Sequence, residues 1–368
     1  MHFSESRENR MGKRFRDHKI FFVFIWITAI LPFTSAAQQK ERKKKKKGIQ
    51  LPTPVPPDHK YIADYHKELT ARIFGSRKFT TYGLHDKGFA EDLLYRPNTP
   101  FNIGVGFNYR ILGINAGFNL PLINDTKERG RTRYLDIQSH FYGRRLLVDF
   151  YLQQYKGFYL SNTSIINGNN NDQVYIRPDL YTLNFGLVVQ FIPNGKKFSF
   201  RGAFLQNEVQ LQSAGSPIIG GSISDVAVRS DSSIIPVNIR YRGYFNDFDY
   251  NRSDVKSLAF NFGYGYTLVL PHHLFITAAG TAGVGINYSN LWMSQGNSTA
   301  AFGTDINATI RIGMGFNSRR YYAGMHYLGS VATSSTPIVY TRQQFGAGNF
   351  RISFARRFTL KKKLFGFY

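Results

Sequence analysis

Eight charged residues lie on the polar side of stretches in which apolar and polar residues alternate, and these are the positions where chemistry is expected. Alternation places residues of equal parity on one face of a strand, so these side chains share a face opposite the apolar one. The eight residues are Arg145, Arg201, Arg311, Arg351, Arg357, Asp136, Asp149 and Asp305. Buried charge must be paired or hydrated, so arginines and carboxylates that pair would fill a narrow interior. Surplus arginines would instead form a basic passage for small anionic solutes, and the sequence favours the pairing interpretation.

Other side chains carry weaker signals of catalysis or metal binding. Asp247, Asp249 and Asp254 could offer carboxylate oxygens to Ca²⁺, but the segment lacks the spaced glycine and terminal glutamate of a calcium loop, which favours a solvated loop. His140 and His326 stand on polar faces without a serine in register, so an outer-membrane hydrolase is the least favoured alternative. The sequence predicts no catalytic residue, no cofactor and no metal site.

Composition narrows the class of protein. The chain has 368 residues, 47 lysines and arginines against 23 acidic residues, and no cysteine, which excludes disulfides and thiolate chemistry. No apolar run reaches the roughly 18 residues of a membrane-spanning helix. That excludes a helical membrane bundle but not a membrane barrel, in whose strands only every second residue is apolar.

Strict alternation from residue 101 onward predicts antiparallel strands. Residues 101–110 and 112–120 fold into a hairpin in which Tyr109 faces Leu112 and every cross-strand pair agrees in face. A second hairpin, with its turn at residues 143–144, pairs Phe141 with Leu146. The same criterion places further strands at about 178–192, 196–211, 255–270, 273–288, 300–317, 319–333 and 346–360.

The connections between these strands are alternately very short and long. Such asymmetry is typical of an outer-membrane barrel, with short periplasmic turns and long extracellular loops. A further strand at residues 74–84 gives an even count, as closure requires. The predicted fold is therefore an all-β, antiparallel transmembrane β-barrel of about 12 strands. A soluble β-sandwich is the rival, but the strands are longer than the roughly 5 to 6 residues usual in soluble proteins.

The chain also divides into predicted segments. A basic start, the apolar core Ile20 to Leu31 and small residues near Ala37 predict a signal peptide cleaved near Ala37, with an uncleaved anchor helix as the weaker alternative. The four-residue spacing of Tyr61, Tyr65 and Leu69 predicts a short helix. The segments are a signal peptide at 1–37, a basic and proline-rich periplasmic linker at 38–60, a short helix at 61–73, an outer-membrane β-barrel at 74–360 and a C-terminal tail at 361–368.

A resemblance to a known family is carried by three stretches, LYRPNTPFNIGVGFNYRILGINAGFNLPL, RGRTRYLDIQSHFYGRRLLVDFYLQQYKGFYLSN and FRISFARRF. They resemble the Bacteroidota family described as domain of unknown function 4421. The resemblance implies an outer-membrane protein of Gram-negative bacteria without an assigned activity, and it supplies no catalytic or ligand residues.

The sequence thus predicts an outer-membrane barrel that is not an enzyme and has a structural or porin-like solute-passage role. The alternative is a binding or assembly partner that acts through extracellular loops. Expected partners are outer-membrane lipid, the barrel-insertion machinery and small anionic solutes. Nucleic acid is not expected, and the barrel is expected to be a monomer.

Overall fold

Antiparallel strands make up most of this protein in the computed structural model, which describes residues 56–109, 112–119, 128–167, 174–294 and 296–360. The long strands are β2 (Leu69–Asp86), β4 (Asn102–Tyr109), β5 (Leu112–Asn119), β6 (Arg133–Tyr142), β7 (Leu146–Leu160), β8 (Ile176–Phe191), β10 (Ala214–Arg229), β11 (Tyr250–Leu270), β12 (Leu274–Met293), β13 (Ser298–Asn317), β14 (Tyr321–Ser335) and β15 (Thr341–Phe358). The shorter elements are β1 (Ile62–Asp64), β3 (Leu93–Arg96), β9 (Glu208–Gln210), α1 (Ser164–Asn167), α2 (Phe200–Phe204), α3 (Val237–Arg240) and the 3₁₀ helix η3 (Tyr244–Asp247). Within these residues, no helix is both long enough and apolar enough to cross a membrane. The predicted all-β, antiparallel class is confirmed.

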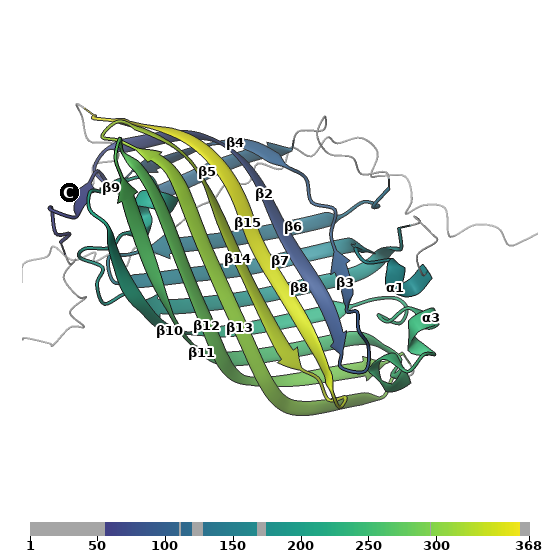
Figure 1. Cartoon of the computed structure of the whole chain (residues 1–368). Coiled ribbons are helices and arrows are strands. Elements are labelled where there is room, and N and C mark those ends of the chain that lie inside the picture. Colours follow the sequence, from purple (N-terminus) through teal and green to yellow (C-terminus); the bar gives the residue numbers. More distant parts are fainter. Residues whose placement is uncertain (1–55, 110–111, 120–127, 168–173, 295, 361–368) are drawn as a thin grey trace, which may run out of the picture.

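The first and last long strands close the sheet into a barrel. β15 pairs with β2 along its whole length, from Thr341 opposite Asp86 to Phe358 opposite Leu69. The closed ring has ten strands, in the order β15, β14, β13, β12, β11, β10, β8, β7, β3 and β2. In Figure 1 the strands of the near wall, such as β13 to β15, cross those of the far wall, such as β7 and β8, as the tilted strands of a closed sheet do. We call the end where Leu69 and Phe358 lie the terminal end, and the opposite end, which carries α1, α3 and η3, the loop end.

Three further strands lie outside this ring, and the predicted count of about twelve is not confirmed. β4 and β5 extend from the side of β2, and β6 pairs with β7. Within the described parts of the chain, β5 and β6 form no pairing with each other. The short strand β3 bridges β2 and β7 nearer the loop end, through pairs such as Tyr95 with Leu160. We call the unpaired boundary between β5 and β6 the seam.

Alternation sends apolar side chains outward and polar ones inward. On β11, Phe260 and Phe262 are about 60% exposed, whereas Asn261 between them is 3% exposed. The same contrast recurs on β13, where Ile310 is exposed and Arg311 is buried. A barrel with an apolar exterior and a polar interior is the arrangement that a lipid environment favours.

The register of one predicted hairpin is confirmed, and that of the other is shifted. Tyr109 on β4 faces Leu112 on β5, as the alternation predicts. Phe141 on β6 faces Val148 rather than Leu146, because four residues, 143–146, separate the first pair, Tyr142 with Leu147, instead of two. A shift by two residues leaves every side chain on its predicted face.

Two predicted elements are wrong. The helix predicted at 61–73 is replaced by β1 and the start of β2, whose cross-strand partners outweigh a helical spacing of apolar residues. The strand predicted at 196–211 forms α2 and β9, while β10 occupies part of the long connection expected between the predicted strands 196–211 and 255–270. The predicted signal peptide, nearly all of the linker and the C-terminal tail lie outside the described residues.

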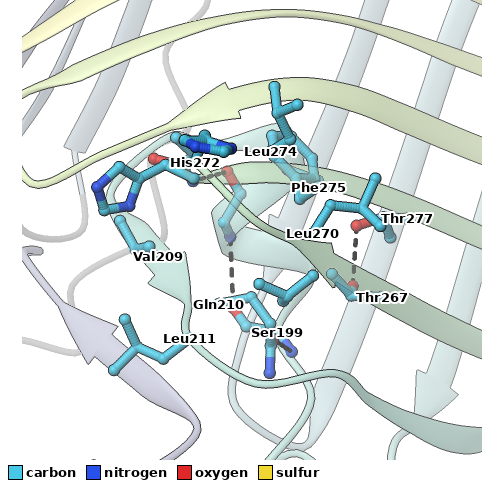
Figure 2. A pocket seen from close by; sticks show the side chains of 15 residues that line it. Ser199, Val209, Gln210, Leu211, Thr267, Leu270, His272, Leu274, Phe275 and Thr277 are labelled. Carbon is cyan, nitrogen blue, oxygen red and sulfur yellow. Dashed lines mark hydrogen bonds between the residues drawn. The ribbon is translucent and has the colours of Figure 1, made fainter.

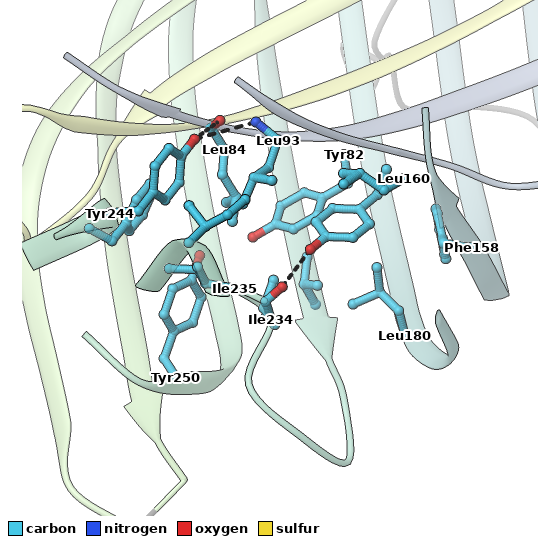
Figure 3. Packing of buried hydrophobic residues seen from close by; sticks show 14 of the residues in the cluster. Tyr82, Leu84, Leu93, Phe158, Leu160, Leu180, Ile234, Ile235, Tyr244 and Tyr250 are labelled. Atoms are coloured by element: carbon cyan, nitrogen blue, oxygen red, sulfur yellow. Dashed lines mark hydrogen bonds between the residues drawn. The ribbon is translucent and has the colours of Figure 1, made fainter. Parts of the chain in front are cut away.

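A cluster of buried apolar side chains fills the loop end, and we call it the loop cap (Figure 3). Tyr244 donates a hydrogen bond to the carbonyl oxygen of Leu84 at 2.6 Å, and Tyr95 donates one to the carbonyl oxygen of Ile234 at 2.6 Å. The segment that supplies Tyr244 and Ile234, residues 230–249, therefore folds down onto the wall strands. The loop cap covers the interior from this side.

A second cluster fills the terminal end. Residues 192–213 turn into the barrel mouth, and the N-terminal residues 58–66 join them when β1 pairs with β9. Phe200 and Phe204 of α2 pack against Tyr142 on the wall, with ring centroids 5.9 and 5.6 Å from the Tyr142 ring. We call this unit, residues 58–66 and 192–213, the terminal plug.

Candidate functional site in the barrel lumen

Six of the eight predicted lumen charges lie inside the barrel, each with at most 7% exposure: Arg311, Arg351, Arg357, Asp136, Asp149 and Asp305. The other two differ from the prediction. Arg145 is exposed, because it belongs to the turn before β7, where strand alternation no longer fixes the direction of a side chain. Arg201 belongs to α2 of the terminal plug rather than to a wall strand.

A buried ion pair crosses the lumen. Arg311 on β13 and Asp149 on β7 pair through Nη2 and Oδ2, and both side chains are 1% exposed. β7 and β13 stand five steps apart in the ring of ten, so they face each other across the barrel. His140 Nδ1 lies 2.7 Å from the other carboxylate oxygen of Asp149, which adds β6 to the same contact. This cross-lumen pair ties opposite walls together.

A second buried carboxylate, Asp136 on β6, is held by several donors. Tyr155 donates to its Oδ2 at 2.5 Å, and the side-chain amides of Gln138 and Gln153 donate to the same oxygen at 3.1 and 3.2 Å. Lys78 Nζ on β2 lies 3.7 Å from its Oδ1. Lys78 is absent from the sequence prediction. It stands an even number of residues from the buried side chains of β2, so strand alternation could have placed it on the inner face.

Three buried arginines have no carboxylate partner among the described residues; Arg357 donates instead to oxygen atoms of Gln206 and Asn317, and the other two are Arg72 and Arg351. Arg72 on β2 is 4% exposed, and its Nη1 donates to Gln206 Oε1 at 2.6 Å. Arg351 on β15 is 7% exposed, and its guanidinium carbon lies 4.5 Å from the centroid of the Phe74 ring. The sequence prediction missed Arg72 because that residue fell within the segment assigned to a helix.

Charged groups also hold the terminal plug in place. The carboxylate of Glu208 on β9 is fully buried, and it lies 2.7 Å from Arg144 Nη2 and 3.1 Å from Arg201 Nη1. Arg357 Nε donates to the carbonyl oxygen of Gln206 at 2.8 Å. Wall and plug are thus joined by buried ionic and hydrogen-bonded contacts.

Asp64 on β1 belongs to the same network. Its Oδ1 accepts hydrogen bonds from the backbone N–H of His66 at 2.9 Å and lies 2.7 Å from His66 Nδ1. Burial acts to raise the pKa of Asp64, but the hydrogen bonds and charge of His66, together with the charge of Arg201, outweigh burial and lower that pKa to about 2. Asp64 therefore stays ionised over the physiological range.

A cavity of about 310 Å³ opens beside the plug at the terminal end (Figure 2). Gln210 Oε1 accepts a hydrogen bond from the backbone N–H of Ser199, and Thr267 and Thr277 hydrogen-bond on the wall. Ser199 Oγ is occupied, since it donates to Glu208 Oε2 at 2.5 Å and accepts from the N–H of Arg201. In the part of the chain that the structure describes, no three or more His, Asp or Glu side chains form a group suited to a metal ion.

Comparison with known proteins gives one family match. A family model described as Domain of unknown function (DUF4421) matches residues 56–358. No curated protein matches the chain.

Similar solved structures include the outer membrane protease OmpT from Escherichia coli, at 8% identity and TM-score 0.34, with 80% of this chain and 98% of that chain covered. The P. putida toluene transporter TodX shows 7% identity and TM-score 0.21, with 80% and 91% covered. The attachment invasion locus protein Ail of Yersinia pestis shows 10% identity and TM-score 0.21, with 79% and 99% covered. Likenesses of this size carry no assignment of activity.

Proposed function

This chain belongs to the family described as domain of unknown function (DUF4421), and we propose that it is an integral outer-membrane barrel whose lumen is closed at both ends. The proposed source is a Gram-negative bacterium of the Bacteroidota, and the proposed role is structural. The terminal end faces the periplasm, and the loop end faces the cell exterior. Apart from the plug segment 192–213, the connections at the terminal end are tight turns such as 271–273 and 318–320, whereas the loop end carries long connections such as 230–249.

The exterior of the wall supports membrane insertion. Strands β11, β12 and β13 place large apolar side chains outward over their length, including Phe262, Val284 and Phe302 at 59%, 68% and 80% exposure. An exposed apolar face of this extent would promote aggregation in water. Lipid tails remove this tendency to aggregate, since they surround the exposed apolar side chains with an apolar environment.

The closed lumen favours a structural role over solute passage. The loop cap covers one end, the terminal plug covers the other, and the Arg311–Asp149 pair spans the space between them. An open pore requires a continuous hydrated path, and these three features interrupt it. Solute passage would require displacement of the terminal plug.

Two measurements on the refolded protein test the proposal. A closed barrel resists detergent, so the unheated protein should migrate faster in electrophoresis than the same sample after boiling. In planar bilayers, the wild-type barrel should give no sustained conductance steps. A soluble protein without a heat-dependent shift would refute the barrel, and stable open channels would refute the closed lumen.

A binding role at the cell surface is the second candidate, and the loop end favours it. Tyr241 and Tyr340 are 76% and 73% exposed, and Val339 is 64% exposed. Exposed aromatic residues of this kind are enriched where proteins bind one another. Cells that display the Tyr241→Ser variant should lose capture of a surface partner if this role holds.

The remaining parts of the proposal concern export and assembly. A signal peptide is cleaved near Ala37, the barrel-insertion machinery recognises the chain, and the inserted barrel is a monomer surrounded by outer-membrane lipid. The proposal assigns no catalytic reaction and no nucleic-acid partner. Mass determination of the mature N-terminus from purified outer membranes tests the cleavage site.

A further inference from the structure

We propose that the lumen contains a binding site for a phosphate-type oxyanion, formed by Arg72, Arg351 and His326. The inference rests on the proposed closed barrel, and it adds a ligand class to that barrel. Arg72, Arg351 and His326 project from three adjacent strands, β2, β15 and β14, and line one cavity of about 70 Å³. One water needs roughly 10 to 15 Å³ on this scale, so the cavity has room for a small oxyanion with some water.

Unmatched charge is the first argument for this site. Arg311, Lys78, Arg72 and Arg351 carry four positive charges on the inner face of the wall, and two carboxylates of that face, Asp149 and Asp136, pair with Arg311 and Lys78. Asp305 does not compensate the other two. It lies opposite Ser334 on β14, eight residues from His326, which is about 26 Å along an extended strand. Arg72 and Arg351 therefore remain as buried cations that need an anion.

Buried nitrogen atoms without partners are the second argument; the two arginine Nε atoms are donors, and His326 Nδ1 donates in one tautomer. Arg351 Nε, Arg72 Nε and His326 Nδ1 are buried without a hydrogen-bond partner in the described structure. Arg351 is opposite His326 in the β14–β15 register, so the two side chains are neighbours on the inner face. Donors that converge from three strands suit the several oxygens of a tetrahedral oxyanion better than the two oxygens of a carboxylate.

A route to the site is the third argument. Arg351 also lines a second cavity, together with Gly117 of β5 and Tyr134 of β6. These two residues stand on either side of the seam, where the wall has no strand pairing in its described part. Lys78 lines the same second cavity. A path with basic side chains thus leads from the seam to Arg351.

The test uses the full chain refolded in detergent, with inorganic phosphate as the probe. Titration at neutral pH, followed by the heat-dependent gel shift and by ³¹P NMR line width, should show saturable binding and a higher unfolding temperature. Arg351→Gln and Arg72→Gln should weaken binding by about tenfold or more, since each removes a charge-assisted contact. Arg356→Gln is the matched control, because Arg356 lies on the same strand but is exposed on the outside.

A comparison without phosphate separates ligand binding from a structural role. If the cation has no internal partner, Arg351→Gln should be at least as stable as the wild type in phosphate-free buffer, and less stable than it when phosphate is saturating. A wild type that neither inorganic phosphate nor phosphatidic acid stabilises, equal binding by Arg351→Gln, or a loss of stability by that variant in the absence of both ligands would each overturn the site.

A second titration, with phosphatidic acid in mixed micelles in place of inorganic phosphate, distinguishes the two sources of the oxyanion. Binding of inorganic phosphate assigns a free ion, and binding of phosphatidic acid alone assigns a lipid headgroup that enters through the seam; both support the site. Binding of neither overturns it. A wild type without a heat-dependent gel shift would refute the barrel itself, and the site with it, whereas a normal shift with binding of neither inorganic phosphate nor phosphatidic acid refutes the site alone.

Discussion

Replacement of Asp149 by asparagine should destabilise the barrel strongly, because it leaves Arg311 buried without a counter-charge. Both side chains of this pair are 1% exposed, so water cannot replace the lost carboxylate. Breaking a buried ion pair by removal of one partner costs about 3 to 5 kcal/mol. We expect Asp149→Asn to lower the free energy of unfolding by an amount in this range.

A surface pair provides the matched control. Lys256 and Asp225 lie 2.6 Å apart, but their side chains are 64% and 45% exposed, so solvent screens their attraction. Asp225→Asn should therefore cost less than about 1 kcal/mol. Joint replacement in Asp149→Leu/Arg311→Met removes both buried charges and should recover most of the loss.

Guanidinium titration of the refolded protein in lipid vesicles, read by the heat-dependent gel shift, measures all three variants. Asp149→Asn and Asp225→Asn should differ by at least about 2 kcal/mol. Equal costs for these two variants, or a double variant as unstable as Asp149→Asn, would refute the view that the pair braces the lumen as a desolvated contact.

Three further outcomes are expected. Truncation after Asn349 should abolish membrane insertion, since it removes half of β15, while truncation after Leu360 should be tolerated; protease protection in intact cells distinguishes them. Glu208→Gln removes the carboxylate that pairs with Arg144 of the wall and Arg201 of the plug, so protease cleavage of the plug should rise, but not in the exposed-site control Asp231→Asn. The depressed pKa of Asp64 stabilises the plug above about pH 4, and this contribution is lost as the pH falls toward about 2. Pepsin cleavage of the plug should rise in that window, and Asp64→Asn should abolish the pH dependence.

Local alternation was sufficient to predict the wall of the barrel and the orientation of most of its side chains. Ile310 and Arg311 were correctly assigned to opposite faces because a strand has a period of two wherever it forms. The Arg311–Asp149 contact was not predicted as a pair. Its partners lie on opposite walls, and no local pattern states which strands face each other.

The errors concern segments whose fold depends on distant partners. The 196–211 segment has the alternation of a strand, but Phe200 and Phe204 gain more burial in the plug, against wall residues far away in sequence. β10 was missed for the opposite reason. It contains Pro217 and Gly220, which are uncommon inside strands and weaken the sequence signal. The glycine is nevertheless needed by the paired strand, because a Cβ atom at Gly220 would lie 2.1 Å from the carbonyl oxygen of Val189.

The pairing of β2 with β15 has a consequence for how fast this chain reaches its final form. Leu69 and Phe358 begin and end the described barrel strands, so closure waits for contacts of very large sequence separation. The chain loses the entropy of loop closure before such contacts form, so topologies of high contact order fold slowly. Through that interval both terminal strands expose unpaired backbone edges, which are templates for aggregation. Protection of these edges until β2 and β15 pair would therefore favour correct assembly over aggregation.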